Sequence, residues 1–345
     1  MQIRFPSKLV AGDLIAITAP STGVPASLHP RLDLAIKMLK ERGFRVIEGD
    51  CLRAVYKNKS ADKILRAEEL KRFLADPEVK AIMPPWGGEL AMELLELINF
   101  TELAELEPKW FSGFSDLSTL HVPMTTLSGW ATLHGPNLME LAAQPLDAMT
   151  QKIWDVLTSD KGTVITQTSS SFYQEQENNW LIHPKAGLNL TEPTQWKCLD
   201  GKNDSIEFKG RLIGGCLETI SRLAGTTFAN LPMFYQQHAK DGVILYFESS
   251  ELKPCELTRT LLSLKMHGWF DHISGLLIGR NMATEITDPT QQTAFDAIHS
   301  VLNDLKIPIL YDVDIGHVPP QLSLVNGAIA HVKFNENGST ISQYL

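Results

Sequence analysis

Residues 14–47 read LIAITAPSTGVPASLHPRLDLAIKMLKERGFRVI, and this stretch decides the fold class. Leu14–Ala19 is a short apolar run that ends at Pro20, which predicts a buried strand. Leu32–Glu41 has apolar residues at helical spacing, and Phe44–Ile47 predicts the next strand. A strand, a helix and a strand of these lengths indicate a βαβ unit, whose two strands run parallel.

The same alternation continues along the first half of the chain. The sequence predicts strands at Ala81–Met83 and Trp110–Phe114, and helices at Ala67–Leu74, at Ala91–Ile98 and from Leu117 onward. This alternation favours an α/β fold with a mostly parallel sheet. Ligands of such sheets bind at the carboxyl ends of the strands, so we expect the loops at residues 20–23, 86–88 and 115–116 to gather at one edge.

Length and composition indicate two domains, because a chain of 345 residues is longer than one core usually serves. We assign residues 1–165 to an N-terminal α/β domain and residues 210–345 to a smaller C-terminal α/β domain. Residues 166–209 are polar and predict a linker with an irregular loop that carries Trp180 and Trp196. Further on, Asn326-Gly327 before Ile329–Phe334 predicts a hairpin in which 329–334 is the late strand.

Charge and composition exclude several classes of partner. The net charge of -9 disfavours binding to nucleic acid and to anionic membranes. The sequence has no signal peptide and no apolar run that could span a membrane, so we expect a cytoplasmic protein. It lacks the GxGxxG, HExxH and Walker motifs, and its cysteines form no CxxC pair. We therefore expect no cofactor, no metal and no disulfide framework, and four buried, reduced thiols at Cys51, Cys198, Cys216 and Cys255.

Ser115 and the pair Gly87-Gly88 both follow predicted strands. A serine on a tight strand-to-helix turn presents its hydroxyl at the sheet edge, although Ser115 could equally cap the helix that follows. Gly87-Gly88 would let the backbone approach a ligand closely and leave N–H groups free to bind it. The alternative for the glycine pair is a plain tight turn.

Glu248 and His317 are the other candidates for chemistry. Glu248 ends the apolar run Val243–Phe247, where a carboxylate is costly unless it is hydrogen-bonded or functional, and Glu251 competes for the same role. His317 lies in a loop beside Gly316, in a polar and constrained setting. The alternatives are a strand-end charge that reaches water and a structural histidine.

Seven segments carry a resemblance to a known family. They are GDLIAITAPS, RAEELKRFLADPEVKAIMPPWGGE, KWFSGFSDLSTL, LHGPN, GRLIGGCLETISRLAGT, ILYFESSE and DVDIGHVPPQLSLVNG. Their order and spacing resemble the LD-carboxypeptidase family of serine peptidases, and more closely its microcin C self-immunity branch. PPWGGE, in place of an arginine-containing RGGYG, indicates that branch.

The resemblance implies a catalytic triad and an oxyanion hole. Ser115 would be the nucleophile, His317 the general base and Glu248 the carboxylate that orients the imidazole. The backbone N–H groups of Gly88 and Asp116 would form the oxyanion hole. The family's fold implies a flavodoxin-like N-terminal domain, an active site in the cleft between the domains, and a homodimer.

The resemblance also implies substrate-binding residues. Trp86, Gly87 and Glu89 belong to the glycine-pair loop. A tryptophan from the irregular loop is expected to stack on a substrate adenine, with Trp196 preferred over Trp180 because it lies nearer the GRLIGG strand; ordinary packing is the alternative for both. Cys216 departs from the family, which has asparagine after the Gly-Gly pair.

These observations predict a serine peptidase or amidohydrolase that cleaves an amide bond next to a carboxyl-bearing residue. One substrate class is a microcin C-like aminoacyl nucleotide, which Glu89 favours because the classical branch of the family has tyrosine at this position. The second is a muropeptide, as in cell-wall recycling. The alternative from another class is a non-catalytic two-domain protein that binds a small ligand in its cleft.

Overall fold

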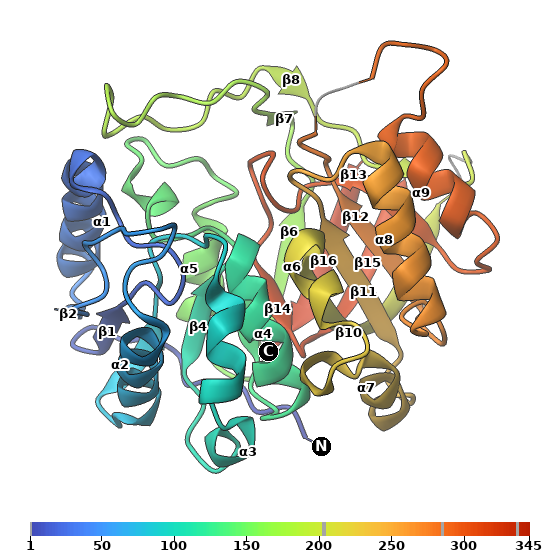
Figure 1. The fold of residues 1–345 in the computed structure, drawn as a ribbon. Coiled ribbons are helices and arrows are strands. Elements are labelled where there is room, and N and C mark those ends of the chain that lie inside the picture. The colour runs from blue at the N-terminus through green and yellow to red at the C-terminus, as the bar shows by residue number, and fades with distance from the viewer. Residues whose placement is uncertain (1, 202–204, 284–285, 336–337) are drawn as a thin grey trace.

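The computed structural model describes residues 2–201, 205–283, 286–335 and 338–345. Its strands form two main sheets, and Figure 1 shows them next to each other, the first mostly in blue to green and the second mostly in yellow to red. This is the mixed α/β architecture that the sequence predicts. None of the helices in the described ranges is long and apolar enough to cross a membrane.

The first sheet has the strand order β2-β1-β3-β4-β5-β14. Its strands are β1 (Leu14–Ile17), β2 (Arg45–Glu48), β3 (Val79–Ile82), β4 (Trp110–Gly113), β5 (Thr132–His134) and β14 (Leu324–Asn326). The first five run parallel in the order 2-1-3-4-5, which is the flavodoxin-like order. β14 pairs antiparallel with β5, although it comes from the C-terminal part of the chain.

The second sheet has the order β6-β16-β15-β10-β11-β12-β13-β9. Its strands are β6 (Val164–Thr168), β9 (Lys197–Cys198), β10 (Ile206–Cys216), β11 (Val243–Glu248), β12 (Gly275–Gly279), β13 (Ile309–Val313), β15 (Ile329–Asn335) and β16 (Gly338–Tyr344). The four strands from β10 to β13 are parallel, and the outer strands are antiparallel. A short pair, β7 (Phe172–Tyr173) and β8 (Glu192–Pro193), lies near the top of Figure 1.

Helices α1 (His29–Glu41) and α2 (Lys63–Ala75) flank the first sheet (Figure 1). α1 has a proline in its first turn and buries the apolar residues of one face, among them Leu32, Ala35 and Leu39. The expected helix at Ala91–Ile98 is a 3-10 helix, η2 (Ala91–Leu97). The other helices in the described ranges are α3 (Phe100–Leu103), α4 (Ser118–Thr126), α5 (Lys152–Leu157), α6 (Leu217–Ile220), α7 (Leu231–Gln237), α8 (Pro254–Met266), α9 (Ala294–Leu302), η1 (Ala26–Leu28), η3 (Ser115–Leu117), η4 (Glu140–Ala142), η5 (Ser221–Leu223) and η6 (Thr227–Ala229).

The central strands of the second sheet, β11 and β12, are buried on both faces. On β11, Leu245 and Phe247 join a large core that also contains residues of the first sheet, whereas Ile244 and Tyr246 join a second cluster on the opposite face. Successive strand residues point to opposite faces, so both sets must be apolar. This explains why residues 243–247 form a continuous apolar run rather than an alternating one.

The two sheets exchange strands across the boundaries expected at residues 165 and 210. β6 and β9 come from the end of the first segment and from the expected linker, yet both belong to the second sheet. β14 returns to the first sheet. Residues 166–209 are therefore more than a linker. The expected strand at 329–334 is β15, and its hairpin partner is the following strand, β16. The strand before the Asn-Gly turn, β14, belongs to the other sheet and pairs with β5.

Candidate active site

Ser115, His317 and Glu248 form a continuous hydrogen-bonded chain. His317 Nε2 lies 3.0 Å from Ser115 Oγ, and His317 Nδ1 lies 2.8 Å from Glu248 Oε2. Ser115 follows β4, Glu248 ends β11, and His317 lies in the loop after β13. The fold thus brings together residues that are 202 and 69 positions apart in the sequence. The contacts expected among these three side chains are present.

Ser115 lies on the sharp turn that follows β4 and is the first residue of η3. Its φ of 63° is in the left-handed region, which non-glycine residues rarely adopt. Phe114 occupies the N-cap position of η3 and makes no side-chain capping bond. The Ser115 hydroxyl lies within hydrogen-bonding distance of the His317 ring, and this geometry does not support the helix-cap interpretation of Ser115.

The Asp116 carboxylate ties this turn to neighbouring loops. Its Oδ2 accepts hydrogen bonds from Ser21 Oγ at 2.5 Å and from Ala91 N at 2.8 Å. Its Oδ1 accepts from Thr119 Oγ1 at 3.2 Å. Because Asp116 is buried, these bonds hold the turn against the loop after β1 and the start of η2.

The glycine-pair loop lies directly against this turn. A Cβ at Gly87 would come within 2.7 Å of Asp116 N and 2.9 Å of Ser115 Cβ, so only glycine allows this approach. Trp86 Nε1 donates to Thr22 O at 2.9 Å, and Thr22 N donates to Gly87 O at 3.2 Å. The three loops expected at one sheet edge therefore meet there.

Glu89 lies on the exposed end of the glycine-pair loop. Its pKa is raised, first by partial burial and then by the nearby carboxylates of Glu251 and Asp116. Glu251, the alternative to Glu248 as the carboxylate of the triad, is exposed and lies near Glu89. Glu248 is the carboxylate that contacts His317.

The Glu248 carboxylate controls the charge of His317. Burial lowers the pKa of His317, but the charge and hydrogen bond of Glu248, with smaller effects from Glu218 and Glu140, raise it to about 9. His317 N also donates to Glu248 Oε2 at 3.3 Å. The carboxylate can therefore orient the imidazole and stabilise an imidazolium.

A buried network, which the sequence did not reveal, holds the His317 loop. Arg280 donates to Asp314 Oδ1 at 2.8 Å, to Val318 O at 3.2 and 3.1 Å, and to Pro320 O at 3.0 Å. Asp314 is fully buried and also accepts from Ser170 N at 3.0 Å and Ser170 Oγ at 2.5 Å. Arg280 thus binds the chain on both sides of His317.

Trp196, the preferred candidate for stacking on a substrate, belongs to this network instead. Its side chain packs in the second core cluster with 4% exposure, and its Nε1 donates to Asp314 Oδ2 at 2.7 Å. The expectation for Trp196 is therefore wrong, because the indole is buried behind the His317 loop. A buried indole N–H needs such a partner.

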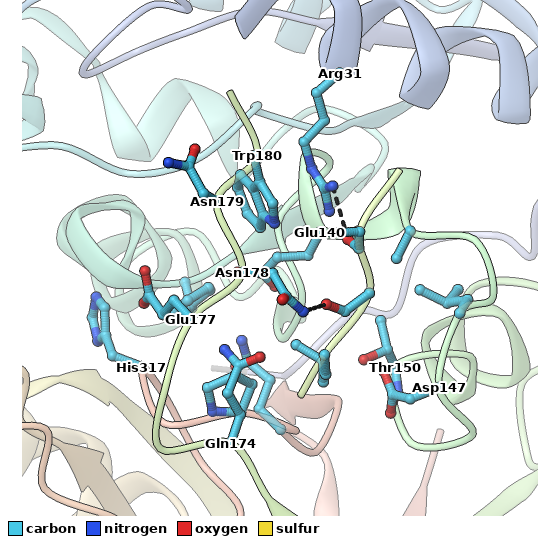
Figure 2. A pocket seen from close by; sticks show the side chains of 18 of the residues that line it. Arg31, Glu140, Asp147, Thr150, Gln174, Glu177, Asn178, Asn179, Trp180 and His317 are labelled. Atoms are coloured by element: carbon cyan, nitrogen blue, oxygen red, sulfur yellow. Dashed lines mark hydrogen bonds between the residues drawn. The ribbon is translucent and has the colours of Figure 1, made fainter. Parts of the chain in front are cut away.

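Trp180, in contrast, lines a cavity of about 510 Å³ beside His317. Figure 2 shows His317 at one side of the cavity and Arg31, Glu140 and Trp180 along another. The Arg31 guanidinium lies over the Trp180 ring, 3.8 Å from its centroid. Arg31 Nη1 also donates to Pro184 O and Ala186 O at 2.9 and 3.0 Å, so it anchors the segment that carries Trp180.

Arg31 and Glu140 were not predicted from the sequence. Burial lowers the pKa of Arg31 to about 10, against the effect of Glu140, and burial raises the pKa of Glu140 to about 7. A signal for Arg31 was available: it continues the buried i, i+4 row of α1 with Ala35 and Leu39. An arginine in an apolar stripe indicates a buried partner.

Cys216 lies at the end of β10, next to Glu248 on β11. Its thiol is buried and donates to Glu218 Oε2 at 3.2 Å. Burial, followed by the carboxylates of Glu248 and Glu218, raises the pKa of Cys216 well above its ordinary value. Of the other cysteines, Cys51 and Cys198 are buried as expected, whereas Cys255 is exposed.

Comparison with known proteins assigns the chain to a family. Residues 15–135 match the LD-carboxypeptidase N-terminal domain, and residues 209–332 match the LD-carboxypeptidase C-terminal domain. The chain belongs to the LD-carboxypeptidase family. Membership supports a serine carboxypeptidase activity.

Relatives of two kinds are similar over nearly the whole chain. The microcin C7 self-immunity protein MccF of Escherichia coli is 24% identical over 98% of this chain and 95% of that protein. A Bacillus subtilis relative, assigned by name to the murein peptide carboxypeptidases, is 25% identical over 97% and 93%. A Vibrio cholerae relative, assigned by name to the carboxypeptidases, is 29% identical over 96% of each chain.

Solved structures agree with the fold. An MccF-like protein from Bacillus anthracis has a TM-score of 0.81 and 26% identity, with 98% of each chain covered. MccF in complex with aspartyl sulfamoyl adenosine has a TM-score of 0.84 and 22% identity, over 100% of this chain and 99% of that one. The self-immunity branch expected from PPWGGE is thus represented among both relatives and structures.

Proposed function

We propose that the protein is a serine hydrolase in which Ser115, His317 and Glu248 act as a catalytic triad. The observation that carries the proposal is the pair of contacts at 3.0 and 2.8 Å on the two ring nitrogens of His317. Ser115 Oγ attacks the carbonyl carbon of an amide while His317 Nε2 takes the hydroxyl proton. His317 then gives that proton to the leaving nitrogen as the C–N bond breaks, and Glu248 stabilises the imidazolium in between. A water that gives its proton to His317 then attacks the acyl-enzyme, which releases the acid product and restores the Ser115 hydroxyl.

The oxyanion of the tetrahedral intermediate would bind to the backbone N–H groups of Gly88 and Asp116. Two features support this assignment. Gly87 lets the loop lie against the Ser115 turn, and the Asp116 side chain fixes that turn through Ser21 and Ala91. N–H donors that are held in place in this way stabilise the oxyanion strongly, because they need no rearrangement during the reaction.

The substrate we propose is an aminoacyl nucleotide with a carboxyl-bearing amino acid. The cavity beside His317 has the volume of a small-molecule site, and Trp180 provides it with an aromatic wall. MccF has been solved with aspartyl sulfamoyl adenosine, a ligand of this class. A base against Trp180 would place the aminoacyl end toward His317 and Ser115.

A muropeptide is the second candidate. It is favoured by the Bacillus subtilis murein peptide relative and by the fold shared with a muramoyltetrapeptide carboxypeptidase from Oxalobacter formigenes, at a TM-score of 0.72. Such a substrate has no base to stack on Trp180. The choice between the two classes therefore depends on that cavity.

Hydrolysis of an aminoacyl sulfamoyl adenosine and of an LD-linked muropeptide tetrapeptide, measured side by side, tests the proposal. We expect turnover of both to require Ser115 and the nucleotide to be the better substrate. The Ser115–His317 contact argues against a non-catalytic binding protein. Labelling at Ser115 by a fluorophosphonate probe separates these two classes, because a binding protein would not react.

The oligomeric state and the cellular compartment are also part of the proposed function. The family resemblance supports a homodimer in the cytoplasm. Light scattering of the purified protein should give twice the mass of one 38.4 kDa chain. Fractionation of the source cells should recover the protein in the cytoplasmic fraction.

A further inference from the structure

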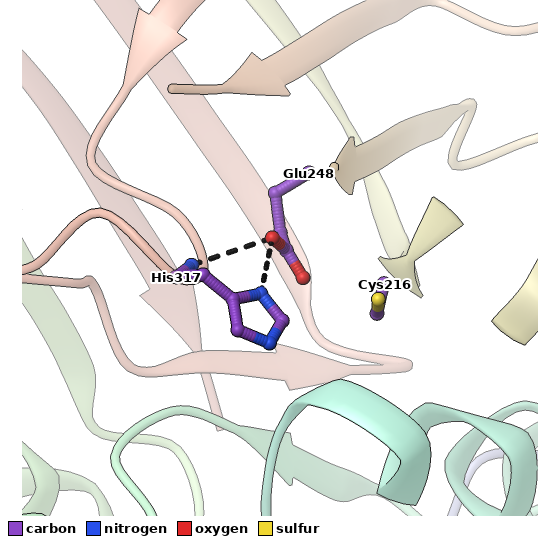
Figure 3. A group of neighbouring side chains, drawn as sticks. All are labelled: Cys216, Glu248 and His317. Carbon is purple, nitrogen blue, oxygen red and sulfur yellow. Dashed lines mark hydrogen bonds and ion pairs between the residues drawn. The ribbon is translucent and has the colours of Figure 1, made fainter. Parts of the chain in front are cut away.

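Three metal-ligating side chains meet behind the Ser115–His317 contact. A nitrogen of His317, an oxygen of Glu248 and the sulfur of Cys216 all lie within 4.8 Å of one another (Figure 3). Cys216 and Glu248 are register partners on β10 and β11, so the sheet fixes their separation. The sequence did not suggest a metal site because the three residues are far apart along the chain.

The Glu248 carboxylate supplies a second observation. The residue is fully buried, and its Oε1 has no hydrogen-bond partner within the described ranges, while Oε2 accepts from His317. A buried charged oxygen without a partner is costly, and a cation would remove that cost.

A further carboxylate adds negative charge beside the cluster. Both carboxylate oxygens of Glu218 accept hydrogen bonds. Its Oε1 accepts from Ser249 Oγ and from the N–H groups of residues 250–252. Its Oε2 accepts from the Cys216 thiol. These bonds keep Glu218 in place. Its charge would favour a divalent cation at the three-ligand cluster.

We infer that Cys216, Glu248 and His317 form an inhibitory site for a zinc-class divalent cation. Sulfur, nitrogen and carboxylate oxygen are the ligands of Zn²⁺, whereas Mg²⁺ and Ca²⁺ prefer oxygen alone. A water would complete four-coordination. This site goes beyond the proposed function, since it depends on the geometry of the cluster and not on the substrate.

The cation would switch the proposed triad off through the His317 tautomer. Nδ1 is the nitrogen that faces Glu248, so the metal would bind to the Nδ1 lone pair. The single proton of the neutral ring must then reside on Nε2, which can no longer accept the Ser115 proton. Cys216 binds as the thiolate and releases its proton to solvent. Removal of the metal reverses both changes.

Cobalt(II) spectroscopy tests the site without any turnover. Co²⁺ added to the Ser115→Ala protein should produce a thiolate-to-cobalt charge-transfer band that Zn²⁺ displaces at one equivalent. Cys216→Ser should abolish the band and weaken Zn²⁺ binding by at least about 10- to 100-fold, because loss of a direct ligand should cost no less than loss of a supporting one. Cys255→Ser, which changes the exposed thiol, should keep the band.

A band that persists in Cys216→Ser, or the lack of a band in the Ser115→Ala protein at millimolar Co²⁺, would overturn the inference. Circular dichroism confirms that each variant is folded, and Cys216→Asn provides a second test with the family's usual residue. In activity assays, Zn²⁺ should inhibit the wild type reversibly, with EDTA restoring the rate, and should inhibit Cys216→Ser far less relative to its own uninhibited rate. If the protein has no hydrolase activity, the cobalt spectra still show whether Cys216 binds the cation.

Discussion

Gly316 packs directly against the Glu248 carboxylate. A Cβ at position 316 would lie 2.1 Å from Glu248 Cγ and 2.3 Å from its Oε2. The φ of Gly316 is 93°, a conformation that favours glycine. The residue before His317 therefore must be small for the carboxylate to reach the imidazole.

Gly316→Ala should displace Glu248 and lower kcat. Gly12→Ala is the matched control, because Gly12 has the same φ of 93° with nothing within 4 Å of the added Cβ. The control should lose only the backbone cost of about 1–2 kcal/mol. Gly316→Ala should lose more stability as well as activity, as measured by urea unfolding and steady-state kinetics. Equal losses of stability, with normal kcat in both, would show that the Gly316–Glu248 contact is not required.

Arg280→Met should destabilise the protein by about 3–5 kcal/mol, because it leaves the fully buried Asp314 without its cationic partner. Arg45→Met is the control: the Arg45–Glu78 pair is exposed, so its loss should cost about 1 kcal/mol or less. Guanidinium unfolding of both variants measures the difference. Similar midpoints for the two variants would contradict the role given to Arg280.

The sequence was sufficient for the part of the fold in which local pattern and topology agree. Apolar runs that end in small or polar residues predicted β1, β3 and β4, and the parallel-sheet rule then placed three loops at one edge. The rule applies because strands of a parallel sheet all end on the same side. Glu248 and His317, in the other half of the chain, were placed through the family resemblance.

The remaining features depend on contacts that local pattern does not encode. Trp180 and Trp196 lie in the same polar segment, yet one lines a cavity and the other packs behind the His317 loop. Their difference comes from β9, a two-residue strand that joins the edge of the second sheet. The Arg280–Asp314 pair was hidden for the same reason, since each is unremarkable without its partner.

The activity should rise with pH through an apparent pKa near 9. Burial lowers the pKa of His317, but Glu248 and more distant carboxylates raise it to about 9, and only the neutral imidazole can accept the Ser115 proton. The same shift stabilises the fold fully below the ordinary pKa of about 6.5, and that contribution is lost as pH rises through about 9. The pH profile of kcat/KM measures the first effect. A rising limb centred at or below pH 6.5 would contradict the electrostatic argument.

Trp180→Ala should lower kcat/KM for an aminoacyl nucleotide by a factor that corresponds to about 1–3 kcal/mol, the range for a base stacked on an aromatic ring. Muropeptide hydrolysis should change little. Trp196→Phe is the control: it keeps a buried ring but removes the donor to Asp314, so it should lower stability by about 1–3 kcal/mol. Its effect on kcat/KM should be the same for both substrates. If Trp180→Ala also impairs both substrates equally, Trp180 serves packing and not recognition.

The kcat and the melting temperature of Ser115→Ala together test whether Ser115 is the nucleophile. The kcat should fall by on the order of 10⁴–10⁶ because the nucleophile is lost, while substrate still binds. The melting temperature should change little, because the Ser115 side chain buries little apolar surface and alanine keeps the same backbone turn. A variant with near-normal kcat, and with a melting temperature lowered as expected for the loss of a helix cap that contributes roughly 1 kcal/mol, would contradict the role of Ser115 as the nucleophile.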